Sequence, residues 1–366
     1  MENSNQSSDQ ANSNPSNAFD PEGPGLVNTG IFGLPYGFNE AELVILPIPW
    51  DITSSYGSGS AYGPEAIYKA SRQVDLMDSD FPEAWKKGIF MLEISKHWQM
   101  TNRTMRPSVR EYLRLLESGA DLSASAIPRQ INEISEELRK WVFDQTKQLF
   151  QAEKIPAILG GEHSVILGAL QAALQKHPEM GMLHLDAHAD LRISYEGFTH
   201  SHASIMHNLL EHGLKSLVQV GIRDYSPGEL NYISKDKRIN TFFQSDLDRK
   251  SYEGISWKAQ VDQIVTALPQ TVWVSLDIDV LDPSLCPNTG TPVPGGLDFG
   301  KTCYLLSEVI KTGKKLIGFD LVEIAPPTNS NNNMSSTNIR DEWDANVGSR
   351  ILFKLCSLAI GSKALG

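Results

Sequence analysis

Short apolar runs alternate with longer amphipathic stretches along most of this chain. Several of the runs are apolar at consecutive positions, which is typical of strands covered on both faces. Helical spacing is clearest in Gln130–Lys154, where Ile131, Ile134 and Leu138 recur three and four residues apart. The predicted strands are Leu43–Ile48, Pro156–Leu159, Met182–Leu185, Leu217–Ile222, Val272–Ile278 and Leu316–Ile324. The further predicted helices are His163–Gln175, Ala203–His212, Lys258–Leu268 and Ser349–Ile360.

Strands that alternate with helices predict an α/β fold, in which helices cover both faces of a parallel sheet. We find no internal repeat and no linker that would divide the apolar pattern, so residues 19–366 are predicted to form one catalytic domain. In sheets of this kind, the ligand site lies beyond the carboxyl ends of the strands.

Two polar segments interrupt this pattern. Residues 1–18 are rich in Asn and Ser and nearly lack large apolar side chains, which predicts a disordered tail. Thr328–Asn338 (TNSNNNMSSTN) is predicted to be a long surface loop. Long loops of this kind are often lids, and a tolerated insertion is the alternative.

The charge balance excludes some classes of partner. The 366 residues include 32 Lys and Arg against 44 Asp and Glu, a formal net charge of −12. Nucleic-acid binding draws on clustered basic residues, so the charge argues against it. The sequence has neither the roughly 20 consecutive apolar residues of a membrane span nor the apolar core of a signal peptide. We therefore expect no membrane association and a cytoplasmic location.

Acidic and histidine side chains follow three of the predicted strands. If these strands are parallel neighbours, their carboxyl ends bring the side chains into one pocket. Four carboxylates placed together would raise one another's pKa values, so the cluster needs cations. Oxygen and imidazole ligands suit Mn²⁺, Fe²⁺, Co²⁺ or Ni²⁺ better than thiolate-preferring metals. The cluster consists of His163, Asp186, His188, Asp190, Asp277 and Asp279.

The number of ligands indicates two metal ions. A tetrahedral zinc takes four ligands, whereas two ions about 3.5–4 Å apart can share carboxylates and a bridging water whose pKa they lower. Any one of these residues alone could equally be a helix cap or a solvated loop residue. The alternation Asp186-x-His188-x-Asp190, repeated as Asp277-x-Asp279, makes that reading improbable for the set as a whole.

Three motifs resemble those of the ureohydrolase superfamily, which contains arginases, agmatinases, formiminoglutamases, guanidinobutyrases and guanidine hydrolases. The motifs are GGEHS at 160–164, HLDAHAD at 184–190 and SLDIDVLDPSLCPNTGTPVPGG at 275–296. The similarity runs from about Leu43 to Ile360 and includes SYGSGSAYGPEAI at 55–67. The resemblance implies a three-layer α/β/α fold with a mainly parallel sheet and hydrolysis of a guanidino C–N bond. It also implies two divalent ions per subunit, Ni²⁺ or Mn²⁺, and a homo-oligomer, either trimer or hexamer.

The resemblance also assigns roles to individual residues. Asp186 and Asp277 would bridge the metals, His163 and Asp190 would be terminal ligands of one ion, and His188 and Asp279 would be terminal ligands of the other. Asp190 would in addition steer the attacking hydroxide. His202 matches the proton-shuttle position, with His200 as second choice. Glu323 matches the carboxylate that grips the guanidinium, and Thr291 matches a pocket threonine.

The substrate is less well specified than the reaction. The Leu191–Thr199 loop lacks the polar pattern with which arginases bind the amino-acid head group, so L-arginine is disfavoured. The segment DLRISYEGFTHSHASIM at 190–206 resembles the agmatinase-like branch. The extended Phe19–Gly33 region and the insertion after Glu323, which runs to Asn346, depart from a typical agmatinase. A longer loop over the metal mouth would shrink the pocket, with Trp343 as part of its wall or as a core or lid-anchor side chain.

A small pocket favours free guanidine, which would give urea and ammonia. The segment SLCPNTGTPVPGG at 284–296 also resembles the nickel-using guanidine hydrolases. Agmatine, guanidinobutyrate and other alkylguanidines are the alternatives. Two hypotheses of other classes are a non-catalytic subunit of a hetero-oligomer and a two-metal phosphoesterase. The intact ligand set disfavours the first, and the scarcity of basic residues beyond Arg192 in the motifs disfavours the second.

Overall fold

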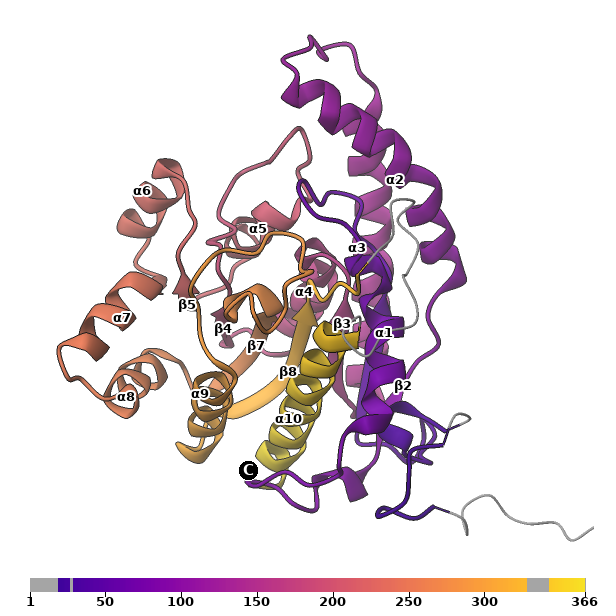
Figure 1. Cartoon of the computed structure of the whole chain (residues 1–366), viewed down its shortest axis with the longest axis vertical. Coiled ribbons are helices and arrows are strands. Elements are labelled where there is room, and N and C mark those ends of the chain that lie inside the picture. The colour runs from indigo at the N-terminus through magenta and orange to yellow at the C-terminus, as the bar shows by residue number, and fades with distance from the viewer. Residues whose placement is uncertain (1–18, 27–28, 328–341, 366) are drawn as a thin grey trace, which may run out of the picture.

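A computed structural model describes residues 19–26, 29–327 and 342–365 (Figure 1). The predicted tail at 1–18 and the predicted loop Thr328–Asn338 lie outside these residues. The described strands form one eight-stranded sheet in the order β2-β1-β3-β8-β7-β4-β5-β6. Every pairing within it is parallel. The strands are β1 Leu43–Ile48, β2 Ile89–Met91, β3 Ile155–Gly160, β4 Gly181–Leu185, β5 Leu217–Ile222, β6 Ile239–Phe243, β7 Thr271–Asp277 and β8 Lys315–Val322.

All six predicted strands are confirmed, and two strands were missed. Both missed strands lie at the edges of the sheet. β2 has only three residues, and β6 is mostly half-buried, so neither carries the fully apolar run of an inner strand. The parallel sheet was therefore predicted correctly for its six inner strands, and its two edge strands were missed.

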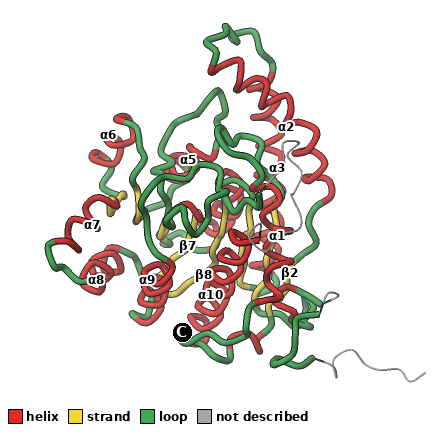
Figure 2. The backbone as a smooth tube through the Cα atoms, viewed as in Figure 1, coloured by secondary structure: helices red, strands yellow, loops and turns green. Residues whose placement is uncertain are grey.

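Helices cover both faces of the sheet, so the fold has three layers (Figures 1 and 2). One apolar core is built by α1, α7, α8, α9 and α10 against one face, and a second by α2, α3, α4 and α5 against the other. The helices are α1 Gly63–Ala70, α2 Lys96–Glu117, α3 Ile127–Gln151, α4 Leu167–Lys176, α5 Ile205–Glu211, α6 Pro227–Lys235, α7 Gln244–Tyr252, α8 Trp257–Ala267, α9 Phe299–Lys311 and α10 Trp343–Leu365.

The five predicted helices correspond to α3, α4, α5, α8 and α10. The one at His163–Gln175 begins as a 3-10 turn over His163–Ile166 before α4, and α5 follows a similar turn at His202–Ser204. Helix α2 was missed because its buried stripe is partly polar. Trp98, Asn102, Arg106 and Val109 are all buried on one face of α2, so the apolar repeat that would indicate a helix is broken.

The order of the strands places the candidate site. After β3 the chain turns to the other half of the sheet, where β4, β5 and β6 lie side by side. β7 and β8 then fill the gap between β3 and β4. A sheet of this kind binds ligands where the order of its strands reverses. The carboxyl ends of β3, β8, β7 and β4 therefore form one continuous edge for the site.

A buried charge cluster fastens α10 to the segment before β2. The Lys354 ammonium lies 2.9 Å from Asp78 Oδ2 and also donates to Asp80, and Lys311 Nζ lies 2.9 Å from Asp80 Oδ1. Burial by itself would raise the pKa of Asp80, but hydrogen bonds from Lys354, Ser307 and Lys311 outweigh it and hold that pKa well below the usual range. Asp80 is therefore ionised throughout the neutral and mildly acidic range.

Replacing Asp80 with asparagine should lower the melting temperature at pH 7 by roughly 2–4 °C. Because the folded-state pKa is depressed, the stabilisation is present above the unfolded pKa of about 4 and declines as the pH falls below it. The difference between wild type and Asp80→Asn should thus shrink between pH 6 and pH 3. Thermal melts across this range test it, with Asp262→Asn, an exposed ion-pair partner of Lys258, as control. A difference that stays constant with pH would contradict the assignment.

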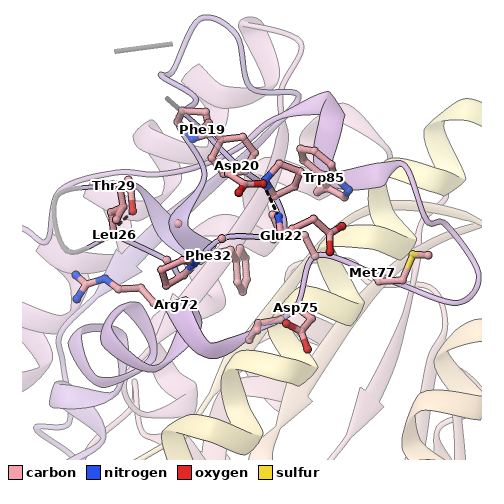
Figure 3. Close-up of a pocket in the computed structure, with 18 of the residues that line it drawn as sticks. Phe19, Asp20, Glu22, Leu26, Thr29, Phe32, Arg72, Asp75, Met77 and Trp85 are labelled. Atoms are coloured by element: carbon pink, nitrogen blue, oxygen red, sulfur yellow. Dashed lines mark hydrogen bonds between the residues drawn. The ribbon is translucent and has the colours of Figure 1, made fainter. Parts of the chain in front are cut away.

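A cavity of about 920 Å³ lies between the first described segment and the chain around Arg72 and Trp85 (Figure 3). The Phe19 and Trp85 rings on its wall are 5.8 Å apart. None of the metal-ligating or catalytic candidates lines this cavity. Within the described part of the chain, no helix has the length and apolar character needed to cross a membrane.

Candidate metal centre

The carboxyl ends of β3, β4 and β7 bring all six predicted ligands together. β4 and β7 are neighbours, as expected, but β3 is separated from β7 by β8. The predicted adjacency of the three strands is therefore wrong at one point. The inserted strand places Glu323 in the gap, next to His163. The four aspartates are almost fully buried, at 0–4 % exposure for Asp186, Asp190, Asp277 and Asp279.

The His163 ring is oriented from behind by a chain of hydrogen bonds. Its Nε2 lies 2.9 Å from Ser275 Oγ, which donates to Asp320 at 2.8 Å. Asp320 also accepts a 2.7 Å bond from the Trp273 indole. Because the Ser275 proton is used on Asp320, its oxygen accepts the Nε2 proton of His163. The Nδ1 lone pair is thereby left free, as a metal ligand requires.

The free nitrogen of His163 faces three carboxylates. Nδ1 lies 3.1 Å from Asp186 Oδ2, 3.2 Å from Asp190 Oδ2 and 3.4 Å from Asp277 Oδ2. It is buried and has no hydrogen-bond partner among the described residues. An unpaired ring nitrogen beside three carboxylate oxygens is a set of ligand atoms that a single cation could bind together.

The second imidazole lies on the other side of Asp186. His188 Nδ1 is 3.0 Å from Asp279 Oδ2 and 3.4 Å from Asp186 Oδ1. Asp186 thus presents Oδ2 to His163 and Oδ1 to His188, the orientation that suits a bridging carboxylate. Two groups of potential ligand atoms share Asp186: one with His163, His184 and Asp190, the other with His188 and Asp279.

His184 belongs to the site and was missed from the sequence. Its Nε2 lies 2.8 Å from Asp186 Oδ2, and its Nδ1 lies 3.1 Å from the amide nitrogen of Gln219. The Gln219 amide donates to Nδ1, so the His184 proton lies on Nε2 and points at Asp186. The available signal was the period of two in a strand, which places His184 and Asp186 on the same face of the sheet.

The backbone is unusual at two site residues. Asp190 and Glu323 are non-glycine residues with φ of 54° and 62°. The neighbouring structure holds both: the Asp190 carbonyl accepts bonds from Met206 and His207, and the Glu323 amide donates to the Gly161 carbonyl at 2.8 Å. Backbone strain of this sort concentrates at functional sites, where surrounding contacts maintain it.

The electrostatics of the cluster favour a cation. Burial and the Asp186 charge raise the pKa of Asp190 to about 6. Burial, followed by the charges of Asp279 and Asp186, raises the pKa of Asp277 well above its usual range. The carboxylates are thus costly to ionise by themselves, and two divalent ions would remove that cost. Oxygen and imidazole donors, the buried free nitrogen of His163 and the two-sided Asp186 all fit such ions.

Glu323 presents a free carboxylate oxygen beside this cluster. Its Oε1 accepts a 2.9 Å bond from the His163 amide, whereas its Oε2 is buried and has no hydrogen-bond partner among the described residues. Burial, then the Glu162 charge, raises the pKa of Glu323 well above its usual range. Thr291 lies close by, with Oγ1 3.4 Å from Asp279 Oδ2.

The remaining predicted residues lie at different places. His202 opens the turn before α5, and its ring meets the Tyr195 ring edge-on at 6.1 Å. Burial, followed by the charge of His188, lowers the pKa of His202 to about 3. His200 instead lies against α3, with Nε2 3.6 Å from Glu136 Oε2. Trp343 is 45 % exposed, and its indole donates to the Ser284 carbonyl.

Comparison with known proteins gives the family. Residues 41–341 match the Arginase family. The chain belongs to the arginase family. An N(1)-aminopropylagmatine ureohydrolase from Thermus thermophilus is 33 % identical over 289 residues, which cover 79 % of this chain and 84 % of that protein. An agmatinase from Cronobacter sakazakii is 30 % identical over 318 residues, covering 86 % of this chain and 88 % of the relative.

Solved structures share the fold of this arginase-family chain. The agmatine ureohydrolase of Thermoplasma volcanium superposes with a TM-score of 0.63 at 22 % identity, covering 88 % of this chain and 92 % of its own. The arginase of Bacillus cereus does so with a TM-score of 0.60 at 20 % identity, covering 86 % and 98 %. The predicted arginase-like α/β fold is confirmed.

Family membership also establishes the general chemistry. The chain is a ureohydrolase, a hydrolase that acts on amidino C–N bonds. Enzymes of this family use a pair of divalent metal ions. The cluster of His163, Asp186, His188 and their neighbours supplies suitable ligands for such a pair.

Proposed function

We propose that this chain hydrolyses free guanidine to urea and ammonia at a two-metal centre. The observation that carries the guanidino assignment is the free Oε2 of Glu323, buried beside the ligand cluster. A carboxylate accepts paired N–H bonds from a guanidinium in one plane. An ionised and unpaired carboxylate is costly to bury, so a cationic guest accounts for its position.

The ligand residues have distinct tasks in this proposal. Asp186 and Asp277 would bridge the ions, with His163 and Asp190 as further ligands of one ion and His188 and Asp279 of the other. When bound, a pair of divalent ions lowers the pKa of a water molecule enough to supply a nucleophile near neutral pH. The carboxylate of Asp190 would orient the attacking oxygen, and Thr291 lies beside Asp279.

His202 carries the proton that the leaving nitrogen needs. Burial lowers the pKa of its imidazole, so the ring is neutral at pH 7 and has a free nitrogen that can take up a proton during the reaction. It then returns that proton to the departing amine, which leaves as ammonia. The same residue thus acts as base and then as acid in one turnover.

Replacing Glu323 with glutamine should lower kcat/KM for guanidine by about 10–100-fold and leave the metal content unchanged. Glutamine has one acceptor oxygen, so it cannot serve both the His163 amide and the guanidinium as the two carboxylate oxygens do. Steady-state urea release and elemental analysis measure the two effects. Glu308→Gln on α9 is the matched control, and an unchanged kcat/KM in Glu323→Gln would remove this residue from substrate binding.

The surroundings of His202 support a small substrate. The Tyr195 ring stands edge-on against His202, and the Arg192 guanidinium lies 4.4 Å above the centre of that ring. The Arg192 side chain also forms an ion pair with Glu229, with Nε 3.7 Å from Oε2. In this proposal the leaving nitrogen must approach His202, so a ring packed against His202 leaves less room for an alkyl substituent than for the amino group of free guanidine.

An alkylguanidine with a second amine, such as agmatine, is the second candidate. The same loop carries Glu196, whose Oε2 is buried and has no hydrogen-bond partner among the described residues. Burial, then the Glu117 charge, raises the pKa of Glu196 to about 7, and an ammonium group would suit such a carboxyl. The names of the Thermus thermophilus and Cronobacter sakazakii relatives point to the same substrate class.

Among guanidine, agmatine, arginine and guanidinobutyrate, guanidine should be turned over with a kcat/KM at least about tenfold above the others. Urea release by purified protein loaded with Mn²⁺ or with Ni²⁺ measures this. Tyr195→Ala should reduce the ratio of kcat/KM for guanidine to kcat/KM for agmatine, because it removes the ring that packs against His202. Equal or better use of agmatine, together with a Glu196→Gln variant that loses agmatine turnover alone, would establish the second candidate instead.

We further propose that the two ions are Ni²⁺ or Mn²⁺, and the resemblance of the SLCPNTGTPVPGG segment to guanidine hydrolases favours nickel. We also propose a homo-oligomeric assembly, trimer or hexamer, and a cytoplasmic location. The complete set of ligands supports an active enzyme over a non-catalytic subunit. Metal analysis of protein purified without added metal, together with light scattering, tests the metal and the assembly.

A further inference from the structure

The loop that follows β1, residues 50–59, carries a buried polar network behind the metal centre. Asp51, Thr53 and Ser54 in this loop are at most 5 % exposed. Helix α2 packs against the loop and contributes Asn102 and Arg106, 7 % and 8 % exposed. Buried polar side chains on a helix are retained where their hydrogen bonds are satisfied, so each contact of these two residues carries information.

Arg106 donates hydrogen bonds to the loop at the residues before and after Thr53. Its two terminal nitrogens donate to the carbonyls of Ile52 at 2.9 Å and Ser54 at 2.7 Å. Its Nε lies 3.9 Å from Asp51 Oδ1, which balances the buried charge. The two bonds hold the peptide unit directly before Thr53 and the one after Ser54, and so restrain the backbone that carries the Thr53 side chain.

Asn102 secures the start of the same loop. Its amide nitrogen donates to Asp51 Oδ1, and its amide oxygen accepts from the Asp51 backbone nitrogen, both at 2.9 Å. Asp51 Oδ2 in turn accepts a 2.7 Å bond from the Gly59 amide, which closes the loop on itself. Asn102 and Arg106 are four residues apart, so one face of α2 makes both attachments.

Thr53 connects this loop to two parts of the site. Its hydroxyl donates to Glu162 Oε1 at 2.8 Å, and its amide donates to Glu162 Oε2 at 2.8 Å. The same hydroxyl oxygen accepts a 3.3 Å bond from the His202 amide. Glu162 immediately precedes His163 and is fully buried. Thr53 therefore touches both the turn that presents a metal ligand and the turn that presents His202.

We propose that Arg106 and Thr53 are positioning residues of this enzyme: Arg106 on α2 holds the loop so that the Thr53 hydroxyl fixes the His202 turn relative to the His163 turn. The proposal rests on the catalytic role of His202 proposed above. Proton transfer demands that His202 stay within hydrogen-bond reach of the reacting atoms, and a displacement of about 1 Å can cost a hundredfold in rate.

Three variants test the positioning role. Thr53→Val keeps the shape and removes the hydroxyl, Thr53→Ser keeps the hydroxyl, and Arg106→Met removes both carbonyl contacts. Arg110→Met is the matched control, since Arg110 is exposed one turn further along α2. Thr53→Val and Arg106→Met should each lower kcat by about tenfold or more with KM within about twofold, whereas Thr53→Ser and Arg110→Met stay near wild type. Two metal ions per chain should be retained throughout.

Hydrogen exchange measured by mass spectrometry provides a readout that does not depend on turnover. Peptides covering 51–59 and 201–206 should exchange faster in Arg106→Met and Thr53→Val than in wild type, and Arg110→Met should not change them. If wild type hydrolyses none of the four guanidino compounds, the proposed function fails and the exchange data alone decide the positioning role.

Three results would overturn the proposal. One is unchanged kcat and unchanged exchange in Thr53→Val and Arg106→Met. Another is a loss of kcat that Thr53→Ser shares in full, because that variant keeps the hydroxyl. A loss that appears only together with lost metal would likewise show that the network supports His163 alone and does not position His202.

Discussion

Replacing Asp277 with asparagine is expected to abolish measurable turnover, with kcat/KM reduced by more than about a hundredfold. Even the loss of a group that merely orients a metal ligand costs about 10–100-fold, and in the proposed function Asp277 would bind both ions directly. Its Oδ2 lies 3.4 Å from His163 Nδ1, and its Oδ1 accepts the 3.0 Å bond from the Asp279 amide. Asparagine can keep the second contact, so the fold should survive while the charge is lost.

Elemental analysis of the same protein should find fewer than two ions per chain. Asp282→Asn is the control, because Asp282 lies on the same loop and bonds Ser284 rather than the cluster. Full metal content and full hydrolysis in Asp277→Asn would rule out the two-metal assignment. A circular dichroism spectrum identical to wild type would show that the loss is local.

Removing the imidazole of His202 should lower kcat by about 10²–10⁴-fold, the range that general acid–base catalysis contributes. The metal content should not change, since His202 is outside the ligand cluster. KM should change little, because Glu323 and not His202 is proposed to hold the guanidinium. Single-turnover urea release separates the chemical step from product release.

His200→Ala is the matched control for His202→Ala. His200 lies two residues away but faces Glu136 on α3, so its loss should leave kcat within about threefold of wild type. If His200→Ala loses the activity while His202→Ala keeps it, the roles of the two histidines are reversed.

The sequence was sufficient to predict the inner strands and the residues that follow them. A strand buried on both faces must be apolar along its length, so the first polar residue after it marks the point where the chain leaves the sheet. That rule located Asp186, the motifs around the other strand ends located His163 and Asp277, and the resemblance to ureohydrolases supplied Glu323. The position of β8 between β3 and β7 was not foreseen. Strand order depends on helix crossovers, which leave no local pattern.

The residues that position the site, Arg106, Thr53 and Glu162, could not be predicted from the sequence for a different reason. Arg106 and Thr53 are 53 residues apart, and Glu162 is 109 residues from Thr53. A buried arginine on a helix looks the same in sequence as an exposed one, and only its carbonyl partners distinguish them. His184 was missed because a single histidine inside an apolar strand usually reports a satisfied core residue. Trp343 was predicted as part of the pocket wall or as a core or lid-anchor side chain; it is 45 % exposed, and its place at the pocket stays a prediction.

The spacing of the site along the chain has a consequence for how the enzyme matures. His163 and the Glu323 carboxylate that accepts its amide proton are 160 residues apart, and the strands between them enter the sheet out of sequence order. β7 and β8, the last strands to be synthesised, fill the middle of the sheet. A nascent chain that stops before β7 lacks both Asp277 and Asp279, so it holds at most four of the six ligand candidates. Binding of both ions would therefore require β7 to be in the sheet, and metal starvation during synthesis should trap chains late, after most of the fold is in place.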